Sequence, residues 1–327
     1  MSRLIDGIRQ NSFVVLGRVG MDLSPDPAGT KTENAASMIV GMGGSSANIA
    51  AGLSKFGGKT ALVTSVSADA VGDFCVNQLR DYGVGTDYVR RVTGEFRTSL
   101  AIYESRLEDH KTVLYRNAAA DFQVTTADID RVDLTLFGAL ITAGTVFAAD
   151  PSRNATFHAF ERARALDLPI VFDIDYRPYS WPSADVAAEV LSRAGGLAQM
   201  IVGNDEEFGF MAGNMAKGLQ KAQDLASSTA SVVIYKMGEK GAITFAGGEE
   251  IRTGIYPVTA LKPTGAGDSF MAGLLSGIAA GLPLRAAVLR GSACAAIVVA
   301  KPGCAPAMPN EAQLDAFLKD HPGPIAA

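Results

Sequence analysis

The sequence predicts an α/β protein with a doubly wound, mostly parallel sheet that is flanked by helices and carries a small β-sheet lid. Three observations lead to this prediction. Short apolar strands alternate with helical stretches along most of the 327 residues. Glycine-rich turns stand where several strands meet the following helix. One stretch, 87–116, leaves this alternation and has the pattern of paired strands.

The composition indicates a globular protein with a large core. Apolar residues make up 48% of the chain, and the net charge of −5 with scattered basic residues argues against a nucleic-acid partner. No run of ~18 apolar residues appears, and the first residues lack a signal-peptide pattern, so neither a membrane span nor export is expected. Cys75, Cys294 and Cys304 are far apart and odd in number, which predicts no disulfide framework. We therefore expect a reduced, cytoplasmic protein.

The first elements follow from apolar runs and capping residues. The run 13–23 is broken by glycine and predicts a buried first strand. Ser45 and Ser46 end a polar stretch and are expected to cap a helix over 47–57. The alternation continues with a strand and a helix, 60–66 and 70–84.

The lid is expected from a change of pattern. Residues 98–107 and 111–116 have the pattern of two paired strands around a polar turn. Together with part of an earlier polar segment they predict a small sheet above the main one, with lid segments at about 22–44 and 95–118. Because the chain has no linker, charge block or internal repeat, we expect one domain over 1–327.

The alternation then resumes to the end of the chain. Further strands are expected at 139–144, 169–176, 199–205 and 231–238. Helices are expected at 152–166, 183–194 and 214–227. A hairpin of 241–248 against 249–258 precedes two apolar helices, 268–280 and 284–299.

The joint "TGAGD", residues 264–268, combines a glycine-rich turn with an acid where a helix begins. Free N–H groups at a helix N-terminus and the close backbone approach that glycine allows can cradle a phosphate. The helix field is expected to keep Asp268 ionised at neutral pH, and an ionised acid beside a phosphate suits a general base. Taken alone, however, an Asp at this place is more commonly only a helix N-cap.

Three other short stretches are individually ordinary. "GGSSAN" at 43–48 and "NDEE" at 204–207 look like helix starts with capping residues. "KMGEKG" at 236–241 looks like a hairpin turn after an apolar strand. With "TGAGD", however, these stretches in this order resemble the ribokinase-like (PfkB-type) carbohydrate kinases across nearly the whole chain.

The resemblance implies ATP-dependent phosphorylation of a sugar hydroxyl, with Mg²⁺ and a lid that also forms a homodimer contact. Asp268 would be the base that deprotonates the acceptor hydroxyl, beside an anion hole of Gly265, Ala266 and Gly267. Glu207 would hold Mg²⁺ through water. The resemblance assigns nucleotide contacts to Asn204, Lys236, Gly238, Gly241, Thr264 and Gly267. It assigns sugar contacts to Asp22, Gly43, Gly44 and Asn48.

The acceptor is suggested by "DIDYRPYSW", residues 173–181. A strand ends in Asp173 and Asp175, Arg177 follows it, and Arg116 comes from the lid hairpin. Arginine suits bidentate recognition of a carboxylate, so two arginines converging on one pocket favour a sugar acid. Singly, each arginine is more commonly part of a surface salt bridge.

Within the family, the segment D-x-D-Y-R-P-x-x-W resembles the 5-dehydro-2-deoxygluconokinases. That resemblance implies formation of 5-dehydro-2-deoxy-D-gluconate 6-phosphate in inositol catabolism. The 2-keto-3-deoxygluconate kinases have a similar arginine-containing segment and are the alternative. Ribose and fructose kinases are a weaker match, because a neutral sugar gives Arg177 no carboxylate.

One position departs from the family pattern. Many relatives have an Asp two residues before the motif Thr, where it contributes to a monovalent-cation site, and this chain has Lys262 followed by Pro263. K⁺ dependence therefore stays open, and the lysine ammonium replacing the ion is a hypothesis.

Two other classes of protein fit the sequence less well. A nicotinamide dehydrogenase needs G-x-G-x-x-G after the first strand, and "LGRVGMDL" lacks that spacing. A silent sugar-binding protein on the same fold is disfavoured by the intact Gly-Ala-Gly-Asp.

Overall fold

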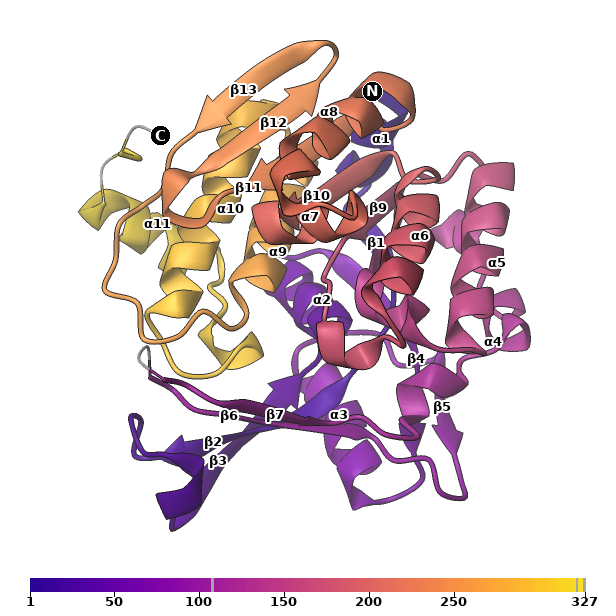
Figure 1. The fold of residues 1–327 in the computed structure, drawn as a ribbon, viewed down its shortest axis with the longest axis vertical. Helices are drawn as coiled ribbons and strands as arrows, with labels where there is room; N and C mark the ends of the chain where they lie inside the picture. The colour runs from indigo at the N-terminus through magenta and orange to yellow at the C-terminus, as the bar shows by residue number, and fades with distance from the viewer. Residues whose placement is uncertain (107–108, 322, 326–327) are drawn as a thin grey trace.

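The computed structural model describes residues 1–106, 109–321 and 323–325. Its centre is a nine-stranded sheet with the order β13-β12-β11-β10-β9-β8-β1-β4-β5 (Figure 1). In chain order its strands are β1 (Ser12–Leu16), β4 (Lys59–Ser67), β5 (Val89–Val92), β8 (Ala139–Ala143), β9 (Ile170–Asp173), β10 (Met200–Asn204), β11 (Val232–Lys236), β12 (Ala242–Ala246) and β13 (Glu249–Thr253). Neighbours from β5 to β11 are parallel, and the β12–β13 hairpin adds to the edge in antiparallel pairing. The predicted doubly wound sheet is confirmed.

Helices cover both faces, and a separate apolar core lies under each layer. One layer contains α1 (Ser2–Arg9), α2 (Ser45–Lys55), α3 (Ala70–Asp81), α9 (Ala266–Ala279) and α10 (Leu284–Val299). The other contains α4 (Thr126–Asp130), α5 (Ser152–Ala165), α6 (Ala184–Gly195), α7 (Asp205–Met211) and α8 (Gly218–Ser228). The last helix, α11 (Glu311–Asp320), packs on α10. In the described part of the chain, no helix has the length and apolar character needed to cross a bilayer.

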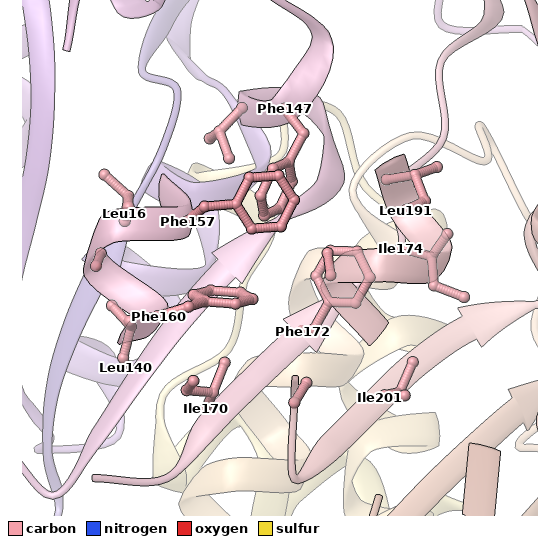
Figure 2. Close-up of a cluster of buried hydrophobic side chains, with 14 of the residues drawn as sticks. Leu16, Leu140, Phe147, Phe157, Phe160, Ile170, Phe172, Ile174, Leu191 and Ile201 are labelled. Atoms are coloured by element: carbon pink, nitrogen blue, oxygen red, sulfur yellow. The ribbon is translucent and has the colours of Figure 1, made fainter. Parts of the chain in front are cut away.

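A cluster of aromatic rings fixes α5 on β9 (Figure 2). Phe147 lies 4.9 Å from Phe157 and 6.0 Å from Phe172 between ring centroids, and all three side chains are buried. Aromatic pairs of this kind contribute roughly 0.5–1.5 kcal/mol beyond the area they bury. Because Phe172 belongs to β9, the cluster holds the strand whose end carries Asp173 and Asp175.

A small four-stranded sheet lies apart from the main body, at the bottom of Figure 1, with the order β3-β2-β6-β7. Its strands are β2 (Gly20–Asp26), β3 (Ser37–Gly43), β6 (Ser99–Tyr103) and β7 (Thr112–Tyr115). β2 pairs with β6 in parallel, whereas the two outer pairs are antiparallel. The predicted small sheet is therefore present. Residues 107 and 108 of the expected hairpin lie outside the described residues.

Two local predictions were wrong. The run 13–23 is not one strand, because β1 ends at Leu16 and β2 begins at Gly20 in the other sheet. At Gly17 a Cβ would lie 2.0 Å from the Ser46 hydroxyl, so α2 packs directly against the turn that separates the strands. Ser45 and Ser46 do not cap α2, because the helix begins at Ser45 with Gly44 as the N-cap residue.

Candidate active site

Several predicted residues meet at the carboxyl ends of the parallel strands, where ligands bind in doubly wound folds. Asn204 ends β10, Lys236 ends the neighbouring β11, and Asp175 follows β9. The starts of α2 and α9 face the same place, because Asn48 of α2 contacts Asp268 of α9. Residues from distant parts of the chain thus converge as the sequence predicted.

The start of α9 is open. The helix begins at Ala266, and its N-cap residue Gly265 has a φ of 85° and no side-chain cap. The N–H groups of Gly265, Ala266 and Gly267 have no hydrogen-bond partner among the described residues. Asp268 stands in the first helical turn, so the interpretation of this acid as an N-cap is wrong. These free N–H groups are donors that a phosphoryl group can use.

Asn48 joins the two helix starts. Its Nδ2 donates to Asp268 Oδ2 at 2.8 Å, which fixes the orientation of the amide, since the carboxylate only accepts. The Oδ1 atom of Asn48 is buried and has no partner in the described part of the protein. A buried acceptor without a donor is costly, so this oxygen fits a hydroxyl donated by a ligand.

The pKa of Asp268 is raised to about 6. Burial is the main cause, and the Asp175 carboxylate adds to it, whereas Asn48, Arg177 and Lys236 oppose the rise. We expected the helix end to favour the charged form, and burial outweighs that effect. At pH 7 roughly a tenth of the acid would carry a proton, so the base form still dominates.

Lys236 lies beside the open start of α9. Its Nζ lies 3.5 Å from the place that a Cβ at residue 267 would occupy, so Gly267 leaves room beside the ammonium. Gly238 has a φ of 58° in the turn after β11, and a Cβ there would meet open space. Gly241 has a φ of 80°, and its Cβ would lie 2.0 Å from the Thr253 carbonyl of β13. Glycine at 241 is therefore required by the strand packing itself.

Asn204 and Glu207 form a capping box at the start of α7. Asn204 Oδ1 accepts from the Glu207 N–H, and Glu207 Oε2 accepts from the Asn204 N–H, both at 2.8 Å. The other oxygen, Oε1, lies 3.9 Å from Arg177 Nη1. Burial raises the pKa of Glu207, and Lys236 and Arg177 oppose that rise.

Buried acidic residues near the start of α7 bear on the predicted Mg²⁺ site. Among the described residues, no group of three or more histidine, cysteine or acidic side chains is arranged to hold a metal ion. In kinase sites, however, Mg²⁺ usually takes only one or two carboxylates and completes its shell with water and phosphate oxygens. Glu207 and its electrostatic neighbour Asp173, both buried, fit this requirement. The sequence predicts no role for Asp173, although it ends β9 two residues before Asp175.

Arg177 is held at the edge of the site. Its Nη2 lies 2.7 Å from Asp175 Oδ1, and 47% of the side chain is exposed. Ser45 Oγ donates to the other oxygen of Asp175 at 2.5 Å. Burial favours the neutral acid, but Arg177 and Ser45 together lower the pKa of Asp175 below its usual value. The first residue of α2 thus helps to hold Arg177 through Asp175, a contact that its predicted capping function did not suggest.

Arg116 is placed differently. Its Nη2 contacts Asp121 at 2.5 Å and donates to the Thr145 carbonyl at 3.1 Å, and both members of the ion pair are buried. The guanidinium also stacks on Phe122, 4.1 Å from the ring centroid. It is near enough to lower the pKa of Asp175. Nη2 is therefore already used within the fold, whereas Nε is buried without a partner among the described residues.

Asp22 lies at the base of the small sheet. A Cβ at Gly43 would lie 1.8 Å from its Oδ1, so glycine is required for the carboxylate to pack against β3. Burial raises the pKa of Asp22 to about 6, and Arg18 and Lys262 oppose the rise. Gly44, with a φ of 98°, completes the turn into α2. The two glycines predicted as sugar contacts thus also have structural roles.

The comparisons with known proteins agree with this geometry. The PfkB family carbohydrate kinase model matches residues 10–311. The chain is 35% identical over 311 residues to the 5-dehydro-2-deoxygluconokinase of Photobacterium profundum, covering 94% of each chain. It is 33% identical over 320 residues to the enzyme of the same name from Geobacillus kaustophilus, covering 96% of each.

Solved structures show the same fold. A fructokinase variant from Vibrio cholerae with bound fructose, ADP and potassium superposes with a TM-score of 0.81 at 25% identity, covering 94% of this chain and 98% of that one. A ribokinase-type protein of Escherichia coli with ATP and Mg²⁺ gives a TM-score of 0.85 at 18% identity, covering 95% and 99%. The chain belongs to the PfkB family of carbohydrate kinases and is an ATP-dependent sugar kinase.

Proposed function

We propose that this kinase phosphorylates 5-dehydro-2-deoxy-D-gluconate on its terminal hydroxyl to give the 6-phosphate. The observation that carries the proposal is the half-exposed Arg177 at the edge of the site, combined with full-length relatives that bear this activity in their names. A guanidinium offers two parallel donors to a carboxylate, which a neutral sugar lacks. Arg116 is the second arginine predicted for this role, but its pairing with Asp121 leaves it the weaker candidate.

We assign the acceptor's hydroxyl contacts to residues around the start of α2. The free Oδ1 of Asn48 would accept from the reacting or a neighbouring hydroxyl. Asp22 would accept from a more distant hydroxyl, because the missing Cβ of Gly43 lets its carboxylate pack at this turn, and Gly43 and Gly44 would add backbone contacts to the sugar. The carboxylate of the acceptor would then lie toward Arg177 and replace part of its contact with Asp175.

The transfer step follows from the start of α9. Asp268 would take the proton of the acceptor hydroxyl as its oxygen bonds to the γ-phosphorus, and the bond to the bridging oxygen breaks to release ADP. The N–H groups of Gly265, Ala266 and Gly267 would surround the transferring group, and Lys236 would neutralise its charge. Asn204, Gly238, Gly241 and Thr264 would contact the nucleotide. Bound Mg²⁺, held through water by Glu207 with help from Asp173, would offset the phosphate charge.

We also propose that the small sheet acts as the lid and as a dimer contact. Its outer strands expose Ile39 and Val40 of β3 and Val113 and Tyr115 of β7, each at least 44% accessible. A lid that closes over the acceptor would exclude water and direct the phosphoryl group to the sugar. We place the reaction in the cytoplasm, where ATP is the co-substrate.

The test is an ATP-consumption assay over a panel of acceptors. We expect turnover with 5-dehydro-2-deoxygluconate, and much weaker turnover with ribose and fructose. Higher kcat/KM with 2-keto-3-deoxygluconate would shift the assignment to the other sugar-acid kinase. Activity on neutral sugars alone would contradict carboxylate recognition. Asp268→Asn is the control for contaminating kinases, because the turnover of this variant with each acceptor measures the background for that acceptor.

A further inference from the structure

Lys262 is one of the largest fully buried side chains of the protein, with 0% of its surface exposed. Lysine is almost never fully buried unless its charge is paired, since moving an ammonium out of water is costly. Its Nζ donates to the carbonyl oxygen of Thr264 at 2.5 Å. The side chain therefore binds the backbone of its own loop, at the residue two positions later and just before α9 begins.

The carbonyl that Lys262 binds belongs to a particular peptide unit. The C=O of Thr264 and the N–H of Gly265 lie in one planar group, so holding the oxygen fixes the direction of the N–H. That N–H has no partner among the described residues, and it is the first donor of the open helix start. A cation on the oxygen also polarises the peptide and makes its N–H a stronger donor.

The rest of the loop is anchored around this contact. The N–H groups of Leu261 and Lys262 donate to the Val299 carbonyl at 2.7 and 3.2 Å, at the end of α10. On the other side, the Cys304 sulfur lies 3.0 Å from the place of a Cβ at Gly265. Pro263 between lysine and carbonyl has a fixed φ, which limits the freedom of this short ring. The ammonium thus makes a side-chain hydrogen bond within a loop whose other contacts are backbone hydrogen bonds and apolar packing.

The surrounding charges favour a charged lysine. Burial lowers the pKa of Lys262, and the Cys304, Asp268 and Asp22 side chains oppose that decrease. Both acids belong to the proposed site, one on the phosphoryl side and one on the acceptor side. The buried positive charge therefore interacts electrostatically with two carboxylates of the proposed site.

We propose that Lys262 is a positioning residue whose buried ammonium orients and polarises the Thr264–Gly265 peptide, so that its N–H can stabilise the transferring phosphoryl group. The ammonium supplies this positive charge permanently, so wild-type turnover needs no dissociable monovalent ion at this loop. This inference rests on the proposed phosphoryl transfer. Wild-type enzyme that phosphorylates no acceptor would count against that function, whereas an active wild type with an equally active Lys262→Met variant would count against Lys262 alone.

The experiment compares Lys262→Met, which keeps the volume without the charge, with Lys262→Ala, which leaves space for an added cation. We expect kcat of Lys262→Met to fall ~10–100-fold, near the effect of losing one oxyanion donor. KM for both substrates should change less than ~3-fold. In Lys262→Ala, methylammonium, NH₄⁺ or K⁺ at constant ionic strength should restore part of kcat in a saturable way.

Lys55 supplies the matched control. Its ammonium also binds backbone carbonyls, those of Ala305 and Met308 at 2.7 and 2.8 Å, but it ties α2 to the loop after α10 rather than to the phosphate cradle. Lys55→Met should lower the melting temperature without making kcat respond to cations.

Three results would overturn the proposal. The first is a kcat of Lys262→Met within about twofold of wild type. The second is a loss in Lys262→Ala that no cation restores and that parallels a fall in melting temperature as in Lys55→Met. The third is a several-fold stimulation of the wild type by K⁺ at constant ionic strength, which remains measurable even where the variants do not fold.

Discussion

The two helices that meet at the site have similar N-terminal backbone geometry but differ in the groups that they contribute to the site. α2 and α9 each start after a glycine with a left-handed φ, 98° at Gly44 and 85° at Gly265, and neither has a side-chain cap. The start of α2 is buried, and its Ala47 N–H donates to the Arg18 carbonyl. The start of α9 is only partly buried and keeps its N–H groups free.

This difference in burial and in free N–H groups suggests different roles for α2 and α9. The buried start of α2 contributes side chains, with Ser45 donating to Asp175 and Asn48 donating to Asp268. An open start offers backbone donors, and α9 adds the acid that would receive the proton. The same glycine-rich signature thus predicts acceptor binding at α2 and phosphoryl transfer at α9. Changes at α9 should lower kcat, and changes linked to α2 should mainly raise KM for the acceptor.

The largest expected effect is at Asp268. Asp268→Asn keeps the shape and can still accept from Asn48, but it removes the base, so turnover should fall ~10²–10⁴-fold. Binding of a non-hydrolysable ATP analogue, measured by calorimetry, should be nearly unchanged. Turnover within about tenfold of wild type would remove Asp268 from the base role.

The next effect tests the acceptor side. Arg177→Ala should raise KM for an acidic acceptor ~10–100-fold, since a hydrogen bond to a charged group contributes about 1.5–3 kcal/mol. Steady-state kinetics with an acidic and a neutral acceptor make the comparison, and the neutral one should change little. An equal rise for both acceptors would dismiss carboxylate recognition.

Arg116→Ala is a useful contrast. It leaves Asp121 buried without its partner, and breaking such a pair costs about 3–5 kcal/mol. We therefore expect a loss of folding stability in urea rather than a selective change of KM. A selective rise in acceptor KM at unchanged stability would assign carboxylate recognition to Arg116 as well.

A smaller effect concerns pH. With the pKa of Asp268 near 6, kcat/KM should decline about tenfold per unit at pH values well below it, because the base becomes protonated. The hydrogen bond from Asn48 lowers that pKa, so Asn48→Ala should move the acid limb to higher pH. Loss of activity would then be greater at pH 6 than at pH 8. An unchanged acid limb would show that Asn48 does not affect the pKa of the group that titrates there.

The smallest effect compares the two glycines. A Cβ at Gly44 would lie 2.4 Å from the Arg18 carbonyl, whereas one at Gly265 would lie 3.0 Å from the Cys304 sulfur. Each Gly→Ala change also forces a left-handed φ that costs about 1–2 kcal/mol. Urea unfolding should show the greater loss for Gly44→Ala, and kinetics the greater loss of kcat for Gly265→Ala. The reverse pattern would contradict the division of tasks.

Periodicity and motif order predict much of this molecule. The alternation of strands and helices, the small sheet and the strand ends that carry Asp175, Asn204 and Lys236 all follow from local patterns. The pKa direction of Asp268 was not predictable, because it depends on burial by distant segments. Ser45 was mistaken for a cap because its actual partner, Asp175, is 130 residues away. Local sequence likewise contains no signal that the Lys262 side chain folds back onto Thr264.

The central claim is that the site formed by the starts of α2 and α9 transfers a phosphoryl group from ATP to the terminal hydroxyl of a sugar acid. Phosphorus NMR of the wild-type reaction with ATP and 5-dehydro-2-deoxygluconate tests it most directly. The account predicts one new phosphomonoester signal, coupled to the two protons of a CH₂ group and equal in amount to the ADP formed. Inorganic phosphate without a phosphoester, or a phosphoester coupled to a single proton, would contradict it.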